Sequence, residues 1–404
     1  MKANSFFVII FLFGVISGAA NGATDSSSAD KLEISSFGRV VAGKFDQDEA
    51  VFRGYDNSLS FDNDSLVAVR LDYQANDKWA FVAQAIATDD KLKESGIQWL
   101  YADYRPSDVL SFKLGRQRIP FYLYSDVLDV GFAYPWISPP SPLYSSYFFT
   151  EFDGVLGRFD FSNREFSGSF ESYYGFFDGE FNTVNATNMV NIDYVYGLIG
   201  LFNVENWRYR LAYHVGHVDL APDEQLSPLI QALSDTGFNA IAQSLRVEGV
   251  PEYVSIGVDY DSLDVFFKTE LTRISAGESI PLVPTQTSFY TTLGYNFYPF
   301  SAHLTVSASR NRYFTPEQTI PQGLAPQLDE LSRLVDLVYN TRPNDDLKSI
   351  TMGLRYDVSA NIALKIEHTW LEGEKGGRAL FEQLDTTQSK QEGQLMQFAV
   401  EWVF

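Results

Sequence analysis

The side chains best suited to act as a base or a metal ligand near neutral pH are the four histidines, His214, His217, His303 and His368. None of them stands in an HExxH motif or at another recognisable metal-binding spacing, and no phosphate-cradling glycine loop is present. A hydrolase would need a nucleophile beside an oriented base, and His303 shares a strand face with Thr305 and Ser307. Small hydroxyl side chains are, however, expected on any solvated strand face. We therefore expect no enzymatic activity, no metal and no cofactor.

Acidic side chains outnumber basic ones, with 52 Asp and Glu against 30 Lys and Arg and a formal net charge of −22. A chain this acidic repels nucleic acid, so we expect no nucleic-acid partner. The charge would attract cations, and it can equally serve solubility alone.

Residues 1–23 have the pattern of a secretory signal peptide. Lys2 is followed by an apolar core over 6–16 and by small residues over 18–23, with cleavage expected between Ala20 and Ala23. No later stretch approaches the ~20 uninterrupted apolar residues of a membrane-spanning helix. The chain has no cysteine, which argues against a small disulfide-stapled secreted domain. We expect an exported protein with one large domain over 24–404.

Sixteen segments of that domain have strand character. They are residues 32–45, 65–74, 78–87, 97–105, 109–118, 153–161, 165–176, 189–202, 206–218, 251–260, 263–274, 287–298, 301–314, 348–358, 361–371 and 392–404. Seven tight turns rich in Asn, Asp, Ser and Pro alternate with longer connections, several of a dozen to over thirty residues. Short turns at one rim and long loops at the other are typical of outer-membrane barrels, and a soluble sandwich has no reason to sort its loops this way.

The segments also sort their side chains by face. Val67, Val69, Leu71 and Tyr73 alternate with polar residues, and the last segment, FAVEWVF over 398–404, alternates aromatic with small or charged residues. A charge facing lipid near the bilayer centre costs about 2–4 kcal/mol, so repeated sorting of this kind favours a membrane barrel. The 33 Phe and 23 Tyr suit its aromatic girdles. The predicted fold is all-β: a transmembrane antiparallel barrel of about 16 strands, with short periplasmic turns and long extracellular loops.

Three of the long loops have character of their own. The segment 119–152 holds eleven aromatic residues and five prolines, so it is expected to fold back against the barrel wall. The loops 222–250 and 314–347 are expected to be extracellular. Apolar spacing near three and four predicts helices over 226–245 and 328–340 within them.

The strings KLGRQRIPF over 113–121 and FDGVLGRFDF over 152–161 flank the aromatic loop. Together with the signal segment, the sixteen strands and the terminal Phe404, they resemble the Gram-negative general-diffusion porins over essentially the whole mature chain. The resemblance implies that 119–152 is the third loop, bent into the lumen to narrow it, and that the protein is a homotrimer of the bacterial outer membrane. It also implies a water-filled channel for passive diffusion of small hydrophilic solutes and ions.

In the porins that the chain resembles, carboxylates on the third loop face basic side chains on the opposite wall. Carried over to this sequence, the acidic candidates are Asp126, Asp129, Glu151 and Asp153. The basic candidates are Arg39, Arg70, Arg208, Arg210 and Arg355. Charges of this kind tune ion selectivity in a wet pore. Each arginine could instead form a structural ion pair, for example with Asp72 or Asp357.

Two alternatives to a general channel stay open. Tyr134, Trp136 and Tyr144 could form a stacking surface in a substrate-selective channel for carbohydrates or anions, although aromatic rings equally suit anchoring the loop to the wall. A structural or adhesive barrel whose helical loops bind a surface partner is the second. Arg310 and Arg312 fall on the outward parity near the extracellular end of their strand, where they could bind lipopolysaccharide phosphates unless a bulge shifts the register.

Overall fold

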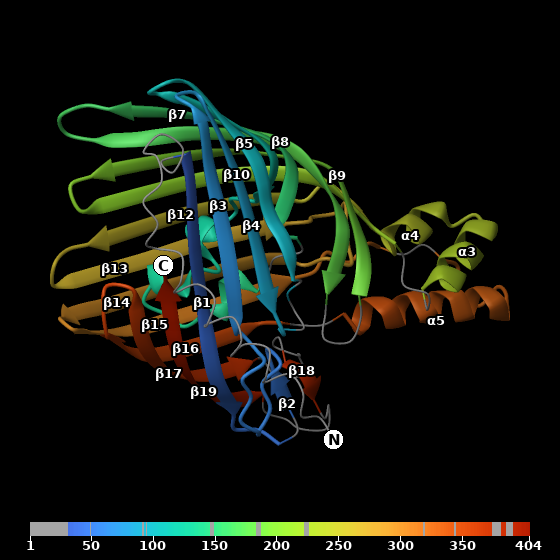
Figure 1. Ribbon diagram of the computed structural model, residues 1–404. Helices are drawn as coiled ribbons and strands as arrows, with labels where there is room; N and C mark the ends of the chain where they lie inside the picture. The colour runs from blue at the N-terminus through green and yellow to red at the C-terminus, as the bar shows by residue number, and fades with distance from the viewer. Residues whose placement is uncertain are drawn as a thin grey trace.

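The computed structural model describes residues 31–48, 50–90, 93, 95–145, 149–182, 187–221, 226–317, 320–342, 345–373, 381–384 and 391–404. The predicted signal segment lies outside these residues. Sixteen antiparallel strands form one closed barrel, seen from the side in Figure 1. Its strands are β1 (Leu32–Phe45), β3 (Leu66–Asn76), β4 (Trp79–Thr88), β5 (Gly96–Ser107), β6 (Leu110–Arg118), β7 (Glu151–Ser162), β8 (Ser167–Asn182), β9 (Thr187–Val204), β10 (Trp207–Leu220), β12 (Glu252–Asp261), β13 (Val265–Ser275), β14 (Thr285–Phe297), β15 (Phe300–Arg312), β16 (Leu347–Asp357), β17 (Ile362–Gly373) and β19 (Glu392–Val403). The prediction of an all-β barrel of about 16 strands is confirmed.

The barrel closes between its first and last strands. β1 pairs with β19 in antiparallel register, from Phe37 opposite Val403 to Phe45 opposite Leu395. The pairing extends to the last residue, because the backbone amides of Ser36 and Phe404 each donate to the other's carbonyl at 2.7 Å. The alternating C-terminal segment is therefore the strand that seals the sheet.

Three short strands lie outside the ring of sixteen. β11 (Val247–Gly249) extends the pairing of β10 beyond β12. β2 (Ala50–Phe52) and β18 (Phe381–Leu384) pair with each other and bring the first and last long loops together.

Side-chain alternation matches the two solvents of a membrane barrel. On β3, Val69, Leu71 and Tyr73 are exposed on the outer face, whereas Arg70 and Asp72 point inward and are half-buried. Near the short turns, outer-face rings stack across neighbouring strands. The pairs, with the distances between ring centroids, are Trp79–Tyr104 at 4.6 Å, Trp207–Tyr260 at 4.7 Å and Phe300–Tyr356 at 4.9 Å. This is the aromatic girdle that the sequence predicts at that rim.

The predicted loop helices are confirmed as α3 (Ser227–Asp235), α4 (Asn239–Ser244) and α5 (Pro326–Asn340). Figure 1 shows them together at the rim opposite the short turns, which we call the long-loop rim. Their apolar faces share a core that includes Leu233, Ile241, Val335 and Tyr339. Among the described residues, no helix is both long and apolar enough to cross a membrane.

Candidate functional site: the barrel interior and loop three

The loop between β6 and β7, which we call loop three (119–150, described except for 146–148), runs through the inside of the barrel. It contains the helical turns η3 (Ser125–Val127), η4 (Gly131–Ala133) and α2 (Ser141–Tyr144), drawn in teal in Figure 1. Pro142 lies in the first turn of α2, where a missing backbone N–H costs no hydrogen bond. The expectation that this aromatic, proline-rich segment folds against the wall agrees with its contacts.

An aromatic cluster packs loop three onto the wall formed by β12–β15. Trp136 is almost fully buried, and its Nε1 donates to Thr305 Oγ1 at 2.9 Å and Thr292 Oγ1 at 3.2 Å. Tyr134 and Tyr144 are buried in the same cluster, beside Tyr253 and Tyr290 of the wall. Their ring faces are covered by protein. The interpretation of Tyr134, Trp136 and Tyr144 as an open stacking surface for sugars is therefore wrong, and they anchor the loop.

Charged wall residues hold the loop by its backbone. Lys365 Nζ donates to the carbonyl oxygens of Gly131 at 2.8 Å, Tyr134 at 2.8 Å and Trp136 at 2.6 Å. From the loop side, the amide of Ile137 donates to Glu367 Oε1 at 2.9 Å. These groups are buried, and each backbone contact satisfies a polar atom that water would otherwise have to reach.

We call wall residues that bind the backbone of loop three clamps. Arg39 lies on the inward face as predicted, but its side chain is only 2% exposed and it is another clamp. It donates to the carbonyl oxygens of Asp64 at 2.7 Å and Ile137 at 2.9 Å, and to Tyr134 Oη at 3.1 Å. Arg53 from the first long loop contacts Asp64 Oδ1 at 2.6 Å. Burial would raise the pKa of the Asp64 carboxyl, but Arg53 and Arg39 outweigh it and lower that pKa to about 2.

Arg210 and Arg355 are two further clamps, again at inward positions. Arg210 donates to Ser255 Oγ at 2.8 Å, to the carbonyl of Phe121 at 2.9 Å, and to the carbonyl of Pro120. Arg355 donates to the carbonyl of Phe132 at 2.8 Å and to Asp357 Oδ1 at 2.8 Å. Arg39, Arg210 and Arg355 therefore position loop three, and Arg355 also has the ion pair with Asp357 that the sequence suggested.

Two of the acidic candidates are engaged where loop three meets the wall. Asp129 is buried and forms ion pairs with Lys93 at 2.9 Å and with Arg118. Burial opposes ionisation of Asp129, but Arg118 and Lys93 outweigh it and hold the pKa of this carboxyl well below its usual range. Glu151 Oε1 lies 3.8 Å from the same Arg118, and Glu151 Oε2 accepts from Thr150 Oγ1 at 2.6 Å.

The prediction that Asp153 lies at the pore constriction is wrong. Its carboxylate accepts two hydrogen bonds from Arg116, at 3.1 and 2.8 Å. Arg116 and Asp153 are register partners, and Asp153 shares the parity of Val155, which is exposed on the outer face. The pair therefore lies outside the barrel, away from the lumen.

The wall of β3–β8, opposite the clamps, carries inward charges that solvent reaches. Arg70 contacts Asp72 at 2.7 Å, and Arg158 contacts Asp160 at 2.8 Å and Glu171 at 2.9 Å. Each Arg–Asp pair joins residues i and i+2, which share one face of a strand. Arg158 is 41% exposed although it points into a closed barrel, so the space beside it is accessible to solvent.

Asp126 is the acidic candidate that remains exposed on loop three. It interacts electrostatically with Arg158 and Glu171 across that solvent-accessible space. Arg208, the fifth basic candidate, is also exposed on the inward parity of β10, next to the short turn. Asp126 and the β3–β8 wall therefore carry solvent-exposed charges of the barrel interior, whereas the clamps are covered by loop three.

Sequence reasoning missed two inward basic groups of this wall, Arg158 and Lys113, both of which interact electrostatically with Glu171. Lys113 points inward beside Tyr101, with Nζ 5.2 Å from the ring centroid. The alternation of Arg158 and Asp160 with Phe159 and Phe161 was a usable signal, because charges that alternate with large apolar residues mark the wet face of a strand.

The interior also contains an arrangement that superficially suits catalysis. His303 Nε2 lies 3.2 Å from Glu367 Oε1, and His303 Nδ1 lies 3.4 Å from Thr305 Oγ1. Thr305 is 1% exposed and covered by Trp136, so a substrate has no access to its hydroxyl. Across the described residues, no three His, Cys, Asp or Glu side chains are grouped to hold a metal ion.

Arg310 and Arg312 lie at the long-loop end of β15. Both are exposed on its outer face, opposite Thr287 and Thr285 of β14, without a register shift between the two strands. The positions agree with the outward parity predicted for them, and their ligand stays a prediction.

Comparison with known proteins places the fold. No protein family and no curated protein matches the sequence. The structure is similar to a loop-deletion mutant of OmpT, an outer membrane protein of Vibrio cholerae, at 11% identity and a TM-score of 0.54 over 93% of this chain and 100% of that one. It is also similar to Salmonella typhi OmpF in complex with daunomycin, at 12% identity and a TM-score of 0.53 over 92% of this chain and 97% of that one. A third similar structure is an anion-selective porin from Comamonas acidovorans, at 10% identity and a TM-score of 0.53 over 93% of this chain and 100% of that one. The chain thus has the fold of Gram-negative outer-membrane barrels.

Proposed function

We propose that the protein is an outer-membrane porin that lets small hydrophilic solutes and ions diffuse passively between loop three and the β3–β8 wall. The observation that carries this proposal is the exposure of inward charges on one side of the barrel. Arg158, Asp160 and Asp126 are solvated inside a closed barrel, whereas the clamps on the other side are buried. A polar, wet interior is what a diffusion channel needs.

Loop three would act as the constriction. Residues on β1, β10, β16 and β17 fix its backbone to the wall. The width of the proposed passage then depends on the side chains of the loop that face away from these strands. In this proposal Asp126 provides the acidic edge, and Arg158, Lys113, Arg70 and Arg208 provide the basic edge. A passage with opposed charges selects ions by field and by width together.

The resemblance and the similar structures also support proposals about assembly, export and location. One of them is described as a trimer form of OmpT, and we propose a homotrimer here as well. We further propose export by the 1–23 signal peptide, a location in the bacterial outer membrane, and lipopolysaccharide contact at Arg310 and Arg312. No cofactor is required for diffusion.

The test is single-channel conductance of the purified protein in a planar bilayer, with a salt gradient to obtain the reversal potential. Steady, ohmic steps with a weak cation preference would support the proposal, because the chain carries a net charge of −22. Saturable block by a sugar or an anion would favour a substrate-selective channel instead. Silence of correctly folded protein would favour a structural or adhesive barrel.

A further inference from the structure

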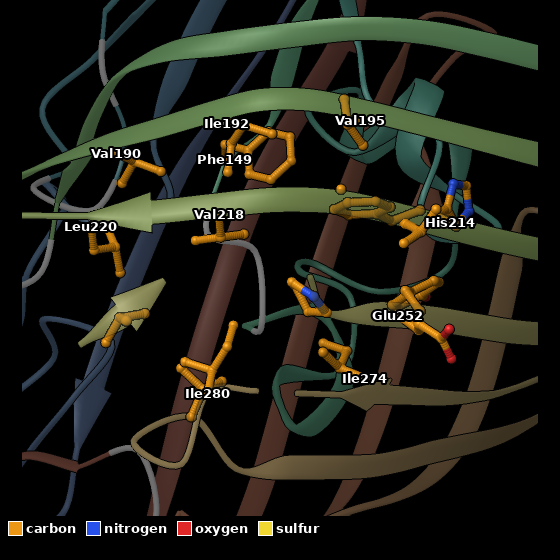
Figure 2. A pocket seen from close by; sticks show the side chains of 17 residues that line it. Phe149, Val190, Ile192, Val195, His214, Val218, Leu220, Glu252, Ile274 and Ile280 are labelled. Carbon is orange, nitrogen blue, oxygen red and sulfur yellow. The ribbon is translucent and has the colours of Figure 1, made fainter. Parts of the chain in front are cut away.

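An apolar cavity opens inside the barrel at the long-loop end of β9, β10 and β12 (Figure 2). Its volume, counted as the space open to the centres of water molecules, is about 80 Å³. Aliphatic side chains form its walls, and Phe121 and Phe149 of loop three lie beside it. One water molecule needs about 10–15 Å³ by this measure, so the cavity has room for several waters or for one small ring. Its mostly apolar lining is typical of small-molecule sites.

The lining contrasts with the rest of the lumen. The inward positions of β9 and β10 carry Val190, Ile192 and Val218 here, where β3 and β7 carry arginines and carboxylates. Glu252 touches the cavity, but its carboxylate accepts from Tyr213 Oη at 3.2 Å on the outer face, and Figure 2 shows it pointing away from the aliphatic walls. A diffusion passage gains nothing from such an apolar surface.

In the described part of the chain, one side-chain nitrogen of the lining lacks a hydrogen-bonding partner. His214 is 1% exposed, and its Nδ1 is hydrogen-bonded to Tyr173 Oη at 2.8 Å. Among the described residues, no donor or acceptor reaches His214 Nε2. A buried nitrogen without a partner is destabilising, and a ligand that hydrogen-bonds to it would remove that cost. Whether Nε2 donates or accepts depends on the tautomer, and a hydroxyl group satisfies either case.

The aromatic rings around His214 favour a flat ligand. Phe121 packs edge-on to the His214 ring at 5.0 Å and parallel to Tyr253 at 5.1 Å, measured between ring centroids. A further ring can join such a group by offset or edge-to-face contact, which adds to the gain from its buried area. Of the residues that the structure describes, no lysine or arginine lines the cavity, so a charged carboxylate would lose its hydration without compensation.

We propose that this cavity is a binding site for a small uncharged aromatic molecule with one hydroxyl group, that is, a simple phenol. The ring would lie among Phe121, Val218 and the neighbouring aliphatic walls, and the hydroxyl would pair with His214 Nε2. The site goes beyond the proposed diffusion function, since binding here does not require conduction.

The test is binding of 4-(trifluoromethyl)phenol at pH 6.5 to the protein in lipid nanodiscs, read from the broadening of its ¹⁹F resonance. Val218→Trp fills the cavity, and Val306→Trp places the same residue on the lipid-facing side as the matched control. Val283→Trp fills the cavity from a loop, which keeps the test valid if the strand variant folds poorly.

We expect broadening that excess 4-ethylphenol reverses in the wild type and in Val306→Trp, and at least tenfold weaker binding in the two filled variants. His214→Phe should weaken phenol binding about fivefold and leave trifluorotoluene unaffected. Equal broadening in wild type and filled variants would show partition into lipid alone and overturn the proposal. Equally tight binding of 4-(trifluoromethyl)benzoate would overturn the assignment to uncharged ligands. Because no current is measured, failure here leaves the proposed channel function standing.

Discussion

Lys365 Nζ lies 2.7 Å from Glu401 Oε2, and both side chains are almost completely shielded from solvent. They belong to β17 and β19, and Lys365 also donates to three carbonyl oxygens of loop three. One buried cation therefore joins the strand next to the barrel seam, the seam strand itself, and the loop that we propose as the constriction.

Replacing Lys365 by Met should release loop three and destabilise the barrel. Removing one partner of a buried ion pair typically costs about 3–5 kcal/mol, because the other charge stays buried and unpaired. We expect a lower midpoint of thermal unfolding and larger, noisier conductance steps. Lys348→Met, at an exposed position on β16, is the control and should behave as the wild type. The double variant Lys365→Met, Glu401→Gln should recover part of the stability but not the steady conductance. A single variant with wild-type steps would contradict the clamp.

Charges at the proposed passage should set ion selectivity in opposite directions. Asp126→Asn removes an exposed carboxylate from loop three, so it should move the reversal potential in a salt gradient toward weaker cation preference. Arg158→Gln removes a cation from the facing wall and should strengthen that preference. Glu205→Gln, at the exposed turn between β9 and β10, leaves the interior unchanged and serves as the control. If both interior variants kept the wild-type reversal potential, the passage would have to lie elsewhere.

Arg208 and Arg210 give a second comparison within one strand. Arg208 is exposed to the lumen, so Arg208→Gln should raise cation preference and leave thermal stability within about 0.5 kcal/mol of the wild type. Arg210 binds three groups around the start of loop three, and Arg210→Gln should destabilise by about 1–3 kcal/mol. Thermal unfolding followed by near-UV circular dichroism measures the difference. Equal stability of the two variants would contradict the distinction.

The Asp64 network should make the first long loop sensitive to acid. The folded-state pKa of Asp64 is about 2, below the usual 3.8, so the carboxylate contributes stability in full above pH ~3.8. That contribution decreases as the pH falls toward 2 and is lost below it. We expect the midpoint of thermal unfolding to drop over this window more steeply in the wild type than in Asp64→Asn. Asp62→Asn, at an exposed neighbour, should retain the wild-type slope. Parallel curves for wild type and Asp64→Asn would refute the role of this carboxylate.

Arg310 and Arg312 should bind lipopolysaccharide phosphates through their exposed guanidinium groups. The variant with both residues changed to Gln should co-purify with less lipopolysaccharide, measured by mass spectrometry of the extracted lipid relative to protein. Replacing Lys78, exposed at the short turn between β3 and β4, removes a positive charge from the opposite rim and serves as the control. Unchanged lipid content in the arginine variant would remove the site.

The strands were predictable because lipid imposes a strict rule on their outer face. Each of the sixteen expected segments overlaps one barrel strand, including the terminal segment that pairs with β1. Alternation of apolar and polar residues is a local property of the chain, so a single sequence displays it directly. The same rule, applied to Arg158 and Asp160, places Asp153 on the outer face two positions beyond Val155. The error at Asp153 therefore lay in choosing it by nearness to the loop instead of by parity.

The clamps could not be read from the sequence. Lys365 and Gly131 are 234 residues apart, and the contact joins a side chain to a backbone carbonyl, which has no residue-type signature. Parity correctly pointed Arg39, Arg210 and Arg355 inward, but it could not tell a solvated arginine from one covered by loop three. Only the fold decides this, because the path of a loop depends on contacts between distant parts of the chain.

The wall holds loop three through hydrogen bonds to its main chain. The amino-acid sequence of the loop can therefore vary at the positions that face solvent. Lys365, Arg210 and Arg355 bind carbonyl oxygens that every amino acid possesses. A substitution at Asp126 alters the chemistry beside the passage and leaves every one of these attachments in place. In the proposed channel, permeation properties can therefore diverge between related barrels, and protein engineers can change them, without disturbing the scaffold that holds the loop.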